Sequence, residues 1–127
     1  SFQALQHRAV DDHMEIELTR SLLYQVCRAI DAGHGNRSLA AAVNARASEA
    51  VLSVTKSAIQ MHGAIGFTDE YDAGLYLRRA MTLAALHGNA SYQRNRYAML
   101  VAAETEEAEG PKRRKRKKPK KSIFASQ

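Results

Sequence analysis

Residues 38–62 read SLAAAVNARASEAVLSVTKSAIQMH, a stretch in which small and apolar side chains return every three or four residues. One face of a helix drawn through this stretch is traced by Leu39, Val43, Ala47, Val51, Val54, Ala58 and Met61 or His62. Its many alanines favour helix formation and let a neighbouring helix approach closely. The stretch therefore predicts an amphipathic helix over residues 38–62, which Asn36 or Ser38 can cap.

Three further helices are expected on either side of this one. The four-residue repeat of Leu18, Leu22, Val26 and Ile30 predicts the first of them, and the other two follow residue 70. Their expected bounds are 2–32, 72–86 and 90–104. Glycine-containing breaks separate the helices. Because short connections make neighbours pack side by side, the predicted fold is all-α, an antiparallel four-helix bundle.

The composition fits one helical domain. The chain has 127 residues, of which 45% are hydrophobic and 25% charged, with no Trp and only 2 Pro. Its one cysteine, Cys27, excludes a disulfide scaffold. No apolar run approaches the roughly 20 residues that a membrane span needs, and the first residues lack the pattern of a secretion signal. We therefore expect a cytoplasmic protein without a membrane span.

The net charge of +6 is divided unevenly along the chain. Nine of the 19 Lys and Arg residues lie within 110–127 and none of the 13 acidic residues does, so residues 1–109 carry a net charge of −3. Residues 105–127 are low in complexity, first acidic and then basic, and we expect them to be disordered beyond a helical domain at 1–104. A basic run can bind nucleic acid, but this one has no interleaved aromatic residues for base stacking. We therefore prefer a solvated tail and do not expect nucleic acid as a partner.

Several kinds of catalytic and binding motif are missing from the sequence. The five histidines and Cys27 show no spacing typical of metal ligands, so no metal site is expected. There is no Gly-x-Ser-x-Gly elbow, no Walker loop and no Gly-x-Gly-x-x-Gly after a strand. The glycines within 63–66 would, by themselves, indicate only the end of a helix.

Residues 60–71 read QMHGAIGFTDEY and are followed by Arg78, while residues 2–8 read FQALQHR. Both segments resemble the C-terminal helical domain of the acyl-CoA dehydrogenase family. Within that family the similarity is closest to a bacterial branch of small subunits that lack the usual catalytic Glu. The resemblance implies a longer protein with an N-terminal helical domain and a middle β-domain, an FAD cofactor, and a dimer or tetramer. It also implies oxidation of the Cα–Cβ bond of an acyl-CoA thioester.

The resemblance assigns roles to individual residues. Phe2 and Gln3 match the family's flavin-contacting pair, an aromatic residue or His followed by Gln. Gln60, Gly63 and Ala64 match a Gln-x-x-Gly-Gly segment that meets the adenosine diphosphate part of a neighbouring subunit's FAD. The residue types suit this contact, because glycine lets the backbone approach a pyrophosphate and the Gln amide offers both donors and an acceptor.

Three positions depart from the family pattern. His87 stands where most members have the Glu that takes the α-proton while hydride leaves the β-carbon for flavin N5. Ala64 replaces the second Gly of the loop, and Arg79 replaces the Asp of an Arg-Asp pair. A histidine can transfer protons near neutral pH, but at a helix break it is more often structural. We therefore do not expect His87 to act as the base.

The sequence thus predicts the C-terminal domain, or a fragment, of an FAD-dependent acyl-CoA dehydrogenase that supplies FAD contacts and an oligomer interface. Alone, such a chain would be inactive, and acyl-CoA would be the substrate of the complete homo- or hetero-oligomeric enzyme. Two alternatives stay open: a non-catalytic subunit of a heteromeric acyl-CoA dehydrogenase, and a helical protein that binds nucleic acid through its basic tail. Apolar faces that other domains would cover also predict self-association of the isolated chain.

Overall fold

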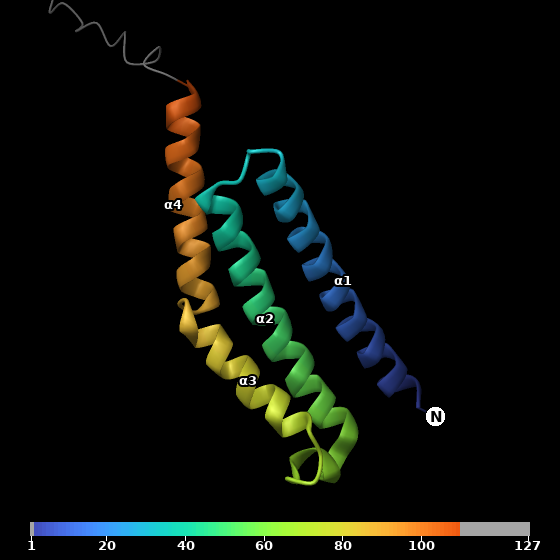
Figure 1. The fold of residues 1–127 in the computed structure, drawn as a ribbon. Helices are drawn as coiled ribbons and strands as arrows, with labels where there is room; N and C mark the ends of the chain where they lie inside the picture. The colour runs from blue at the N-terminus through green and yellow to red at the C-terminus, as the bar shows by residue number, and fades with distance from the viewer. Residues whose placement is uncertain (1, 110–127) are drawn as a thin grey trace, which may run out of the picture.

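The computed structural model describes residues 2–109 as four α-helices and one short 3₁₀-helix (Figure 1). In chain order the elements are α1 (Gln3–Asp31), α2 (Arg37–His62), η1 (Gly63–Phe67), α3 (Ala73–Leu86) and α4 (Ala90–Glu109). The four helices expected from the sequence are therefore present, and the bounds of the first three agree to within one residue. None of the described helices has an apolar stretch long enough to cross a membrane.

The fourth helix is longer than expected. It was predicted to end at residue 104, but α4 continues to Glu109, so residues 105–109 are helical and do not begin a disordered tail. Glu104, where the helix was expected to end, lies inside α4 and contacts the start of α2. Its Oε2 accepts hydrogen bonds from Asn36 Nδ2 at 3.3 Å and from Ser38 Oγ at 3.2 Å, at the start of α2. The carboxylate thus sits at the positive end of that helix dipole. The basic stretch predicted to be disordered, residues 110–127, lies outside the described residues.

The helices form a single layer rather than the antiparallel four-helix bundle predicted from the sequence. α2 lies in the middle, with α1 along one side and α3 and α4 along the other (Figure 1). α3 and α4 follow one another end to end in the same direction. The expectation that all consecutive helices pack antiparallel and side by side is therefore wrong for this pair. It holds for α1 and α2 and for α2 and α3.

Hydrogen bonds across the break at 87–89 explain why α4 continues in line with α3. Asn89 Oδ1 accepts from the backbone N–H of Tyr92 at 2.8 Å and so caps α4. Gln93, which is only 2% exposed, donates through Nε2 to the carbonyl oxygen of His87 at the end of α3. A side chain in the first turn of α4 is therefore tied to the last turn of α3, which holds the two helix ends together.

The contacts between helices are made largely by small side chains. Ala41 of α2 is 2% exposed and Ala80 of α3 is 1% exposed. The buried residues of these two helices are Ser38, Ala41, Ala45, Ser48, Ala50, Ile59, Ala73, Ala80 and Ala84. Small side chains let the helices approach closely, but each buries little apolar area. Much larger apolar side chains, such as Phe2 and Met99, remain exposed.

The apolar stripe of α2 that the sequence suggests as a packing face lines open grooves instead. Val51 is 38% exposed, and Val43, Ala47, Val54 and Ala58 border three grooves beside α2. The reason is the single layer: the flanks of α2 are occupied by α1 on one side and by α3 and α4 on the other. Within residues 2–109 no helix lies over the stripe.

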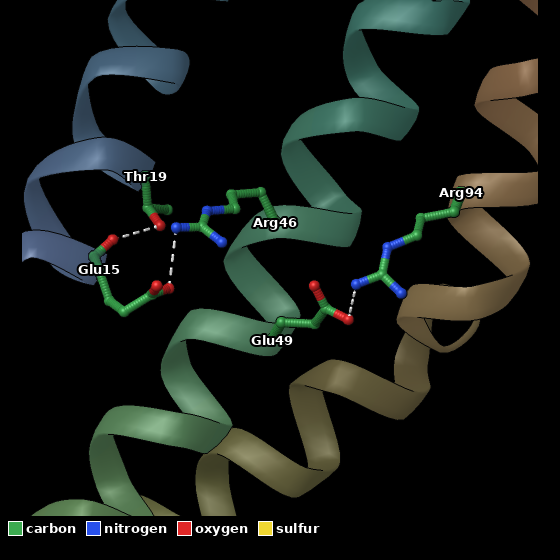
Figure 2. A network of polar contacts seen from close by, with 5 residues as sticks. All are labelled: Glu15, Thr19, Arg46, Glu49 and Arg94. Carbon is green, nitrogen blue, oxygen red and sulfur yellow. Dashed lines mark hydrogen bonds and ion pairs between the residues drawn. The ribbon is translucent and has the colours of Figure 1, made fainter. Parts of the chain in front are cut away.

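Ion pairs cross the other side of α2 and join three helices (Figure 2). Arg46 Nη2 lies 2.9 Å from Oε2 of Glu15 on α1, and Arg94 of α4 pairs with Glu49. Since successive residues of a helix are about 100° apart, Glu49 and Val51 leave α2 on nearly opposite sides. Ion pairs this exposed contribute little to stability. The ion pairs give one side of the layer its charge, and the apolar stripe of α2 lies on the opposite side.

We predict that the apolar side drives self-association of the 127-residue chain. Val51→Glu should weaken the self-association constant by about tenfold, because a charge would have to be buried in the contact. Ser53→Glu places the same charge on the opposite, charged side of α2 and serves as the control. Analytical ultracentrifugation measures both, and equal weakening by the two substitutions would contradict the prediction.

Candidate functional site

The end of α2 carries the segment that the sequence singles out. Gln60 is exposed in the last turn of the helix, and its carbonyl oxygen accepts from the backbone N–H of Gly63. Gly63 has a φ of 63°, a conformation that residues with a Cβ rarely adopt. A Cβ at Gly63 would find no heavy atom within 4 Å, and Ala64 is exposed. The backbone at this turn is therefore open to the approach of a ligand.

The residues after this turn lie back against α2. Gly66 is buried, and a Cβ there would lie 2.7 Å from the carbonyl oxygen of Ile59. Thr68 then closes the loop, because its Oγ1 and its backbone N–H both donate to the carbonyl oxygen of Ile65, at 2.8 Å and 3.1 Å. Glycine at position 66 is thus needed for close packing, and this packing fixes the path of the chain beyond Ala64.

Phe2 and Gln3 lie at the same end of the layer as Gln60, because α1 and α2 are antiparallel (Figure 1). Phe2 is 79% exposed, and Gln3 is exposed as well. The carbonyl oxygen of Phe2 accepts from the backbone N–H groups of Leu5 and Gln6, each at 3.1 Å, as the first turn of α1 forms. All five residues expected to contact a cofactor therefore stand at one end of the layer and are accessible.

His87 lies elsewhere, at the end of α3. It is exposed and borders a groove of about 540 Å³ together with Val26 of α1 and Asn44, Ala47 and Ser48 of α2. Ala47 precedes Gln60 by thirteen residues, which corresponds to about 20 Å along a helix. No carboxylate borders this groove, and among the described residues nothing hydrogen-bonds the His87 imidazole. The ring is therefore not oriented as a general base normally is.

Arg78 and Arg79 are both exposed on α3. In the described part of the chain, no acidic side chain forms an ion pair with either of them. Arg78 and Arg79 therefore place two adjacent positive charges on this helix. Over residues 2–109 the structure also brings no three His, Cys, Asp or Glu side chains together as a metal site would require.

One pair of interacting side chains was not predicted from the sequence. The hydroxyl of Tyr71 lies 2.7 Å from Nε2 of His62, and Nδ1 of His62 lies 2.6 Å from the carbonyl oxygen of Ala58. Both side chains belong to the motif at 60–71, but they are nine residues apart. Only the return of the loop toward α2 brings them together, and no spacing rule for helices would have indicated this contact.

Comparison with known proteins identifies the family. A family profile described as "Acyl-CoA dehydrogenase, C-terminal domain" matches residues 1–102. The chain therefore belongs to the acyl-CoA dehydrogenase family, whose members are FAD-dependent oxidoreductases, and it corresponds to the C-terminal helical domain.

Individual relatives agree with this assignment. The chain is 34% identical over 111 residues to "Acyl-CoA dehydrogenase IpdE2" of Mycobacterium tuberculosis, covering 87% of this chain and 31% of that protein. It is 30% identical over 103 residues to the mitochondrial "Short/branched chain specific acyl-CoA dehydrogenase" of Bos taurus, covering 81% and 24%. The chain thus spans a third or less of the length of these relatives.

A solved structure has the same fold. It is described as "Electron transferring flavoprotein of Acidaminococcus fermentans: Towards a mechanism of flavin-based electron bifurcation". One of its chains superposes with a TM-score of 0.74 at 30% sequence identity, over 80% of this chain and 27% of that chain. The arrangement of α1 to α4 therefore corresponds to part of a larger protein of known structure.

We predict opposite effects for two glycine substitutions near the site. Gly63→Ala should destabilise the protein by about 1 kcal/mol, because an L-residue is strained at this positive φ although space is available. Gly74→Ala, in the first turn of α3 and also with open space around the Cβ, should be neutral or stabilise by up to about 1 kcal/mol. Urea unfolding followed by circular dichroism measures both, and a stabilised Gly63→Ala protein would contradict the assigned backbone conformation.

Proposed function

We propose that this chain acts as the C-terminal helical domain of an FAD-dependent acyl-CoA dehydrogenase and contacts FAD through the end of α2. The observation that carries the proposal is the exposed turn at Gln60–Ala64. This turn combines a free amide side chain with an open, glycine-dependent backbone, in a chain of this family. The apolar side of the layer would contribute an interface to further domains or subunits.

The residues at this end fit the adenosine diphosphate part of FAD. The Gln60 amide can donate to phosphate oxygens or accept from a ribose hydroxyl. Neither Gly63, which has no side chain, nor Ala64, which has only a methyl group, would block a pyrophosphate from the backbone. Phe2, exposed at the same end, offers an aromatic face for a ring. These features support the assignment of all five residues to flavin contacts.

The chain's own part in the reaction would be to bind FAD and orient it. FAD, when bound, supplies the acceptor for the hydride that leaves the acyl chain. The end of α2 would hold the adenosine diphosphate part, far from the groove that contains His87. Cofactor binding and the position equivalent to the family's base are thus separated along α2 by about 20 Å. Proton removal would need a carboxylate, and the described residues around His87 include none.

The surroundings of His87 favour a second candidate function, that of a non-catalytic subunit in a heteromeric acyl-CoA dehydrogenase. The groove around His87 offers Asn44 and Ser48 as its polar neighbours on α2 and no carboxylate. A general base is usually held by a hydrogen bond to a group that orients it. In this role the chain would complete the FAD site of a partner that carries the base.

We predict that Gln60→Ala weakens flavin retention by about tenfold in the protein purified with its natural partners, through loss of hydrogen bonds to the cofactor. Gln25→Ala, an identical change at an exposed position of α1, is the control and should have no effect. Flavin absorbance per chain after gel filtration provides the measurement. Unchanged flavin content in the Gln60→Ala protein would contradict the proposed contact.

We also predict that the 127-residue chain alone shows no acyl-CoA dehydrogenase activity. The test is a dye-reduction assay with added FAD and acyl-CoA substrates of several chain lengths.

In the complete assembly, His87→Ala should retain activity within about twofold, because the unoriented imidazole is not the base. Turnover by the isolated chain, or a loss of activity of more than about a hundredfold in His87→Ala, would contradict this assignment.

A further inference from the structure

A chain of two hydrogen bonds connects the far end of the loop after α2 to the helix itself. The Tyr71 hydroxyl lies 2.7 Å from His62 Nε2, with ring centroids 4.6 Å apart, and His62 Nδ1 lies 2.6 Å from the Ala58 carbonyl oxygen. A carbonyl oxygen can only accept, so Nδ1 carries a proton and donates. In the neutral ring Nε2 is then an acceptor, and the Tyr71 hydroxyl donates to it.

Few other contacts hold this loop against α2. Residues 63–65 and 67–72 are exposed, and within this stretch Gly66 alone is buried. At the near end the backbone N–H of Gly63 donates to Gln60, and in the middle Gly66 packs against Ile59. At the far end the bond from Tyr71 to His62 returns the chain to the helix. Segments with so few buried contacts open at low free-energy cost, so a single polar bond matters here.

The pair itself faces away from Gln60. Two residues apart on a helix, the Gln60 and His62 side chains leave α2 about 200° apart. His62 and Tyr71 border a groove with Val54 and Tyr76, which Gln60 does not border. A ligand held by the Gln60 amide would therefore not contact the pair, and any effect of the pair on the ligand would pass through the backbone.

We propose that His62 and Tyr71 are a positioning pair that holds the Gln60–Ala64 turn in the conformation that receives FAD. This inference rests on the proposed flavin contact. The pair fixes the loop before the cofactor arrives, so that less conformational freedom is lost on binding. Neither residue touches the flavin.

The experiment compares Tyr71→Phe with Tyr76→Phe in the flavin-containing protein purified with its natural partners. Each substitution removes one hydroxyl from the same groove, but within residues 2–109 only the Tyr71 hydroxyl has a hydrogen-bond partner. Flavin release is followed by its fluorescence after dilution, and hydrogen exchange is measured for the amides of residues 63–71. We expect about three- to tenfold faster release and faster amide exchange in Tyr71→Phe, and no change in Tyr76→Phe.

A second comparison separates positioning from a general loss of stability. In a Gln60→Ala background, Tyr71→Phe should cause no further increase in flavin release, because the pair acts through the turn that holds Gln60. An equal increase in both backgrounds, or faster amide exchange with unchanged release, would overturn the inference. If Gln60→Ala by itself leaves flavin release unchanged, or if the purified protein holds no flavin, the proposed function fails instead, and the inference with it.

Discussion

Close packing of α2 between its two flanks is the constraint on which the structure depends. α2 contacts α1 on one side and α3 and α4 on the other, and Ala41, Ala45 and Ala80 are among the residues buried there. Such small side chains permit a short distance between helices but bury little apolar area. With both flanks occupied, α2 has only two free sides. One carries the ion pairs of Arg46 and Glu49, and the other carries the apolar stripe.

The apolar stripe supports the proposal that this domain packs against further domains or subunits. Leu83 and Val51 line the same groove beside α2 and are both more than a third exposed, and contiguous exposed apolar surface marks interaction sites. The chain also spans a third or less of the relatives it matches. The charged side of α2 is suited to solvent, and the apolar side is suited to the interface proposed for it.

The two regions of functional interest depend on different parts of this layer. The Gln60–Ala64 turn is built by the end of α2, by the positive φ of Gly63 and by the packing of Gly66. The position of His87 depends on the break between α3 and α4, where Gln93 bonds to its carbonyl oxygen. A change that disturbs one region need not disturb the other, because the two lie about 20 Å apart along α2 and share no side chain.

From the sequence alone, the starts of all four helices and the ends of the first three could be placed, and the Gln60–Ala64 segment stood out. The helix bounds follow from local chemistry: Asn36 caps α2 through the backbone N–H of Leu39, and a glycine at position 63 ends that helix. The segment was marked by its resemblance to a family motif. The folded chain adds three features: the helices form one layer, α4 continues in line with α3, and Tyr71 meets His62. These features depend on contacts between residues that no spacing rule for helices relates. Such contacts form only when the helices pack and the loop returns, so no local pattern in the sequence encodes them.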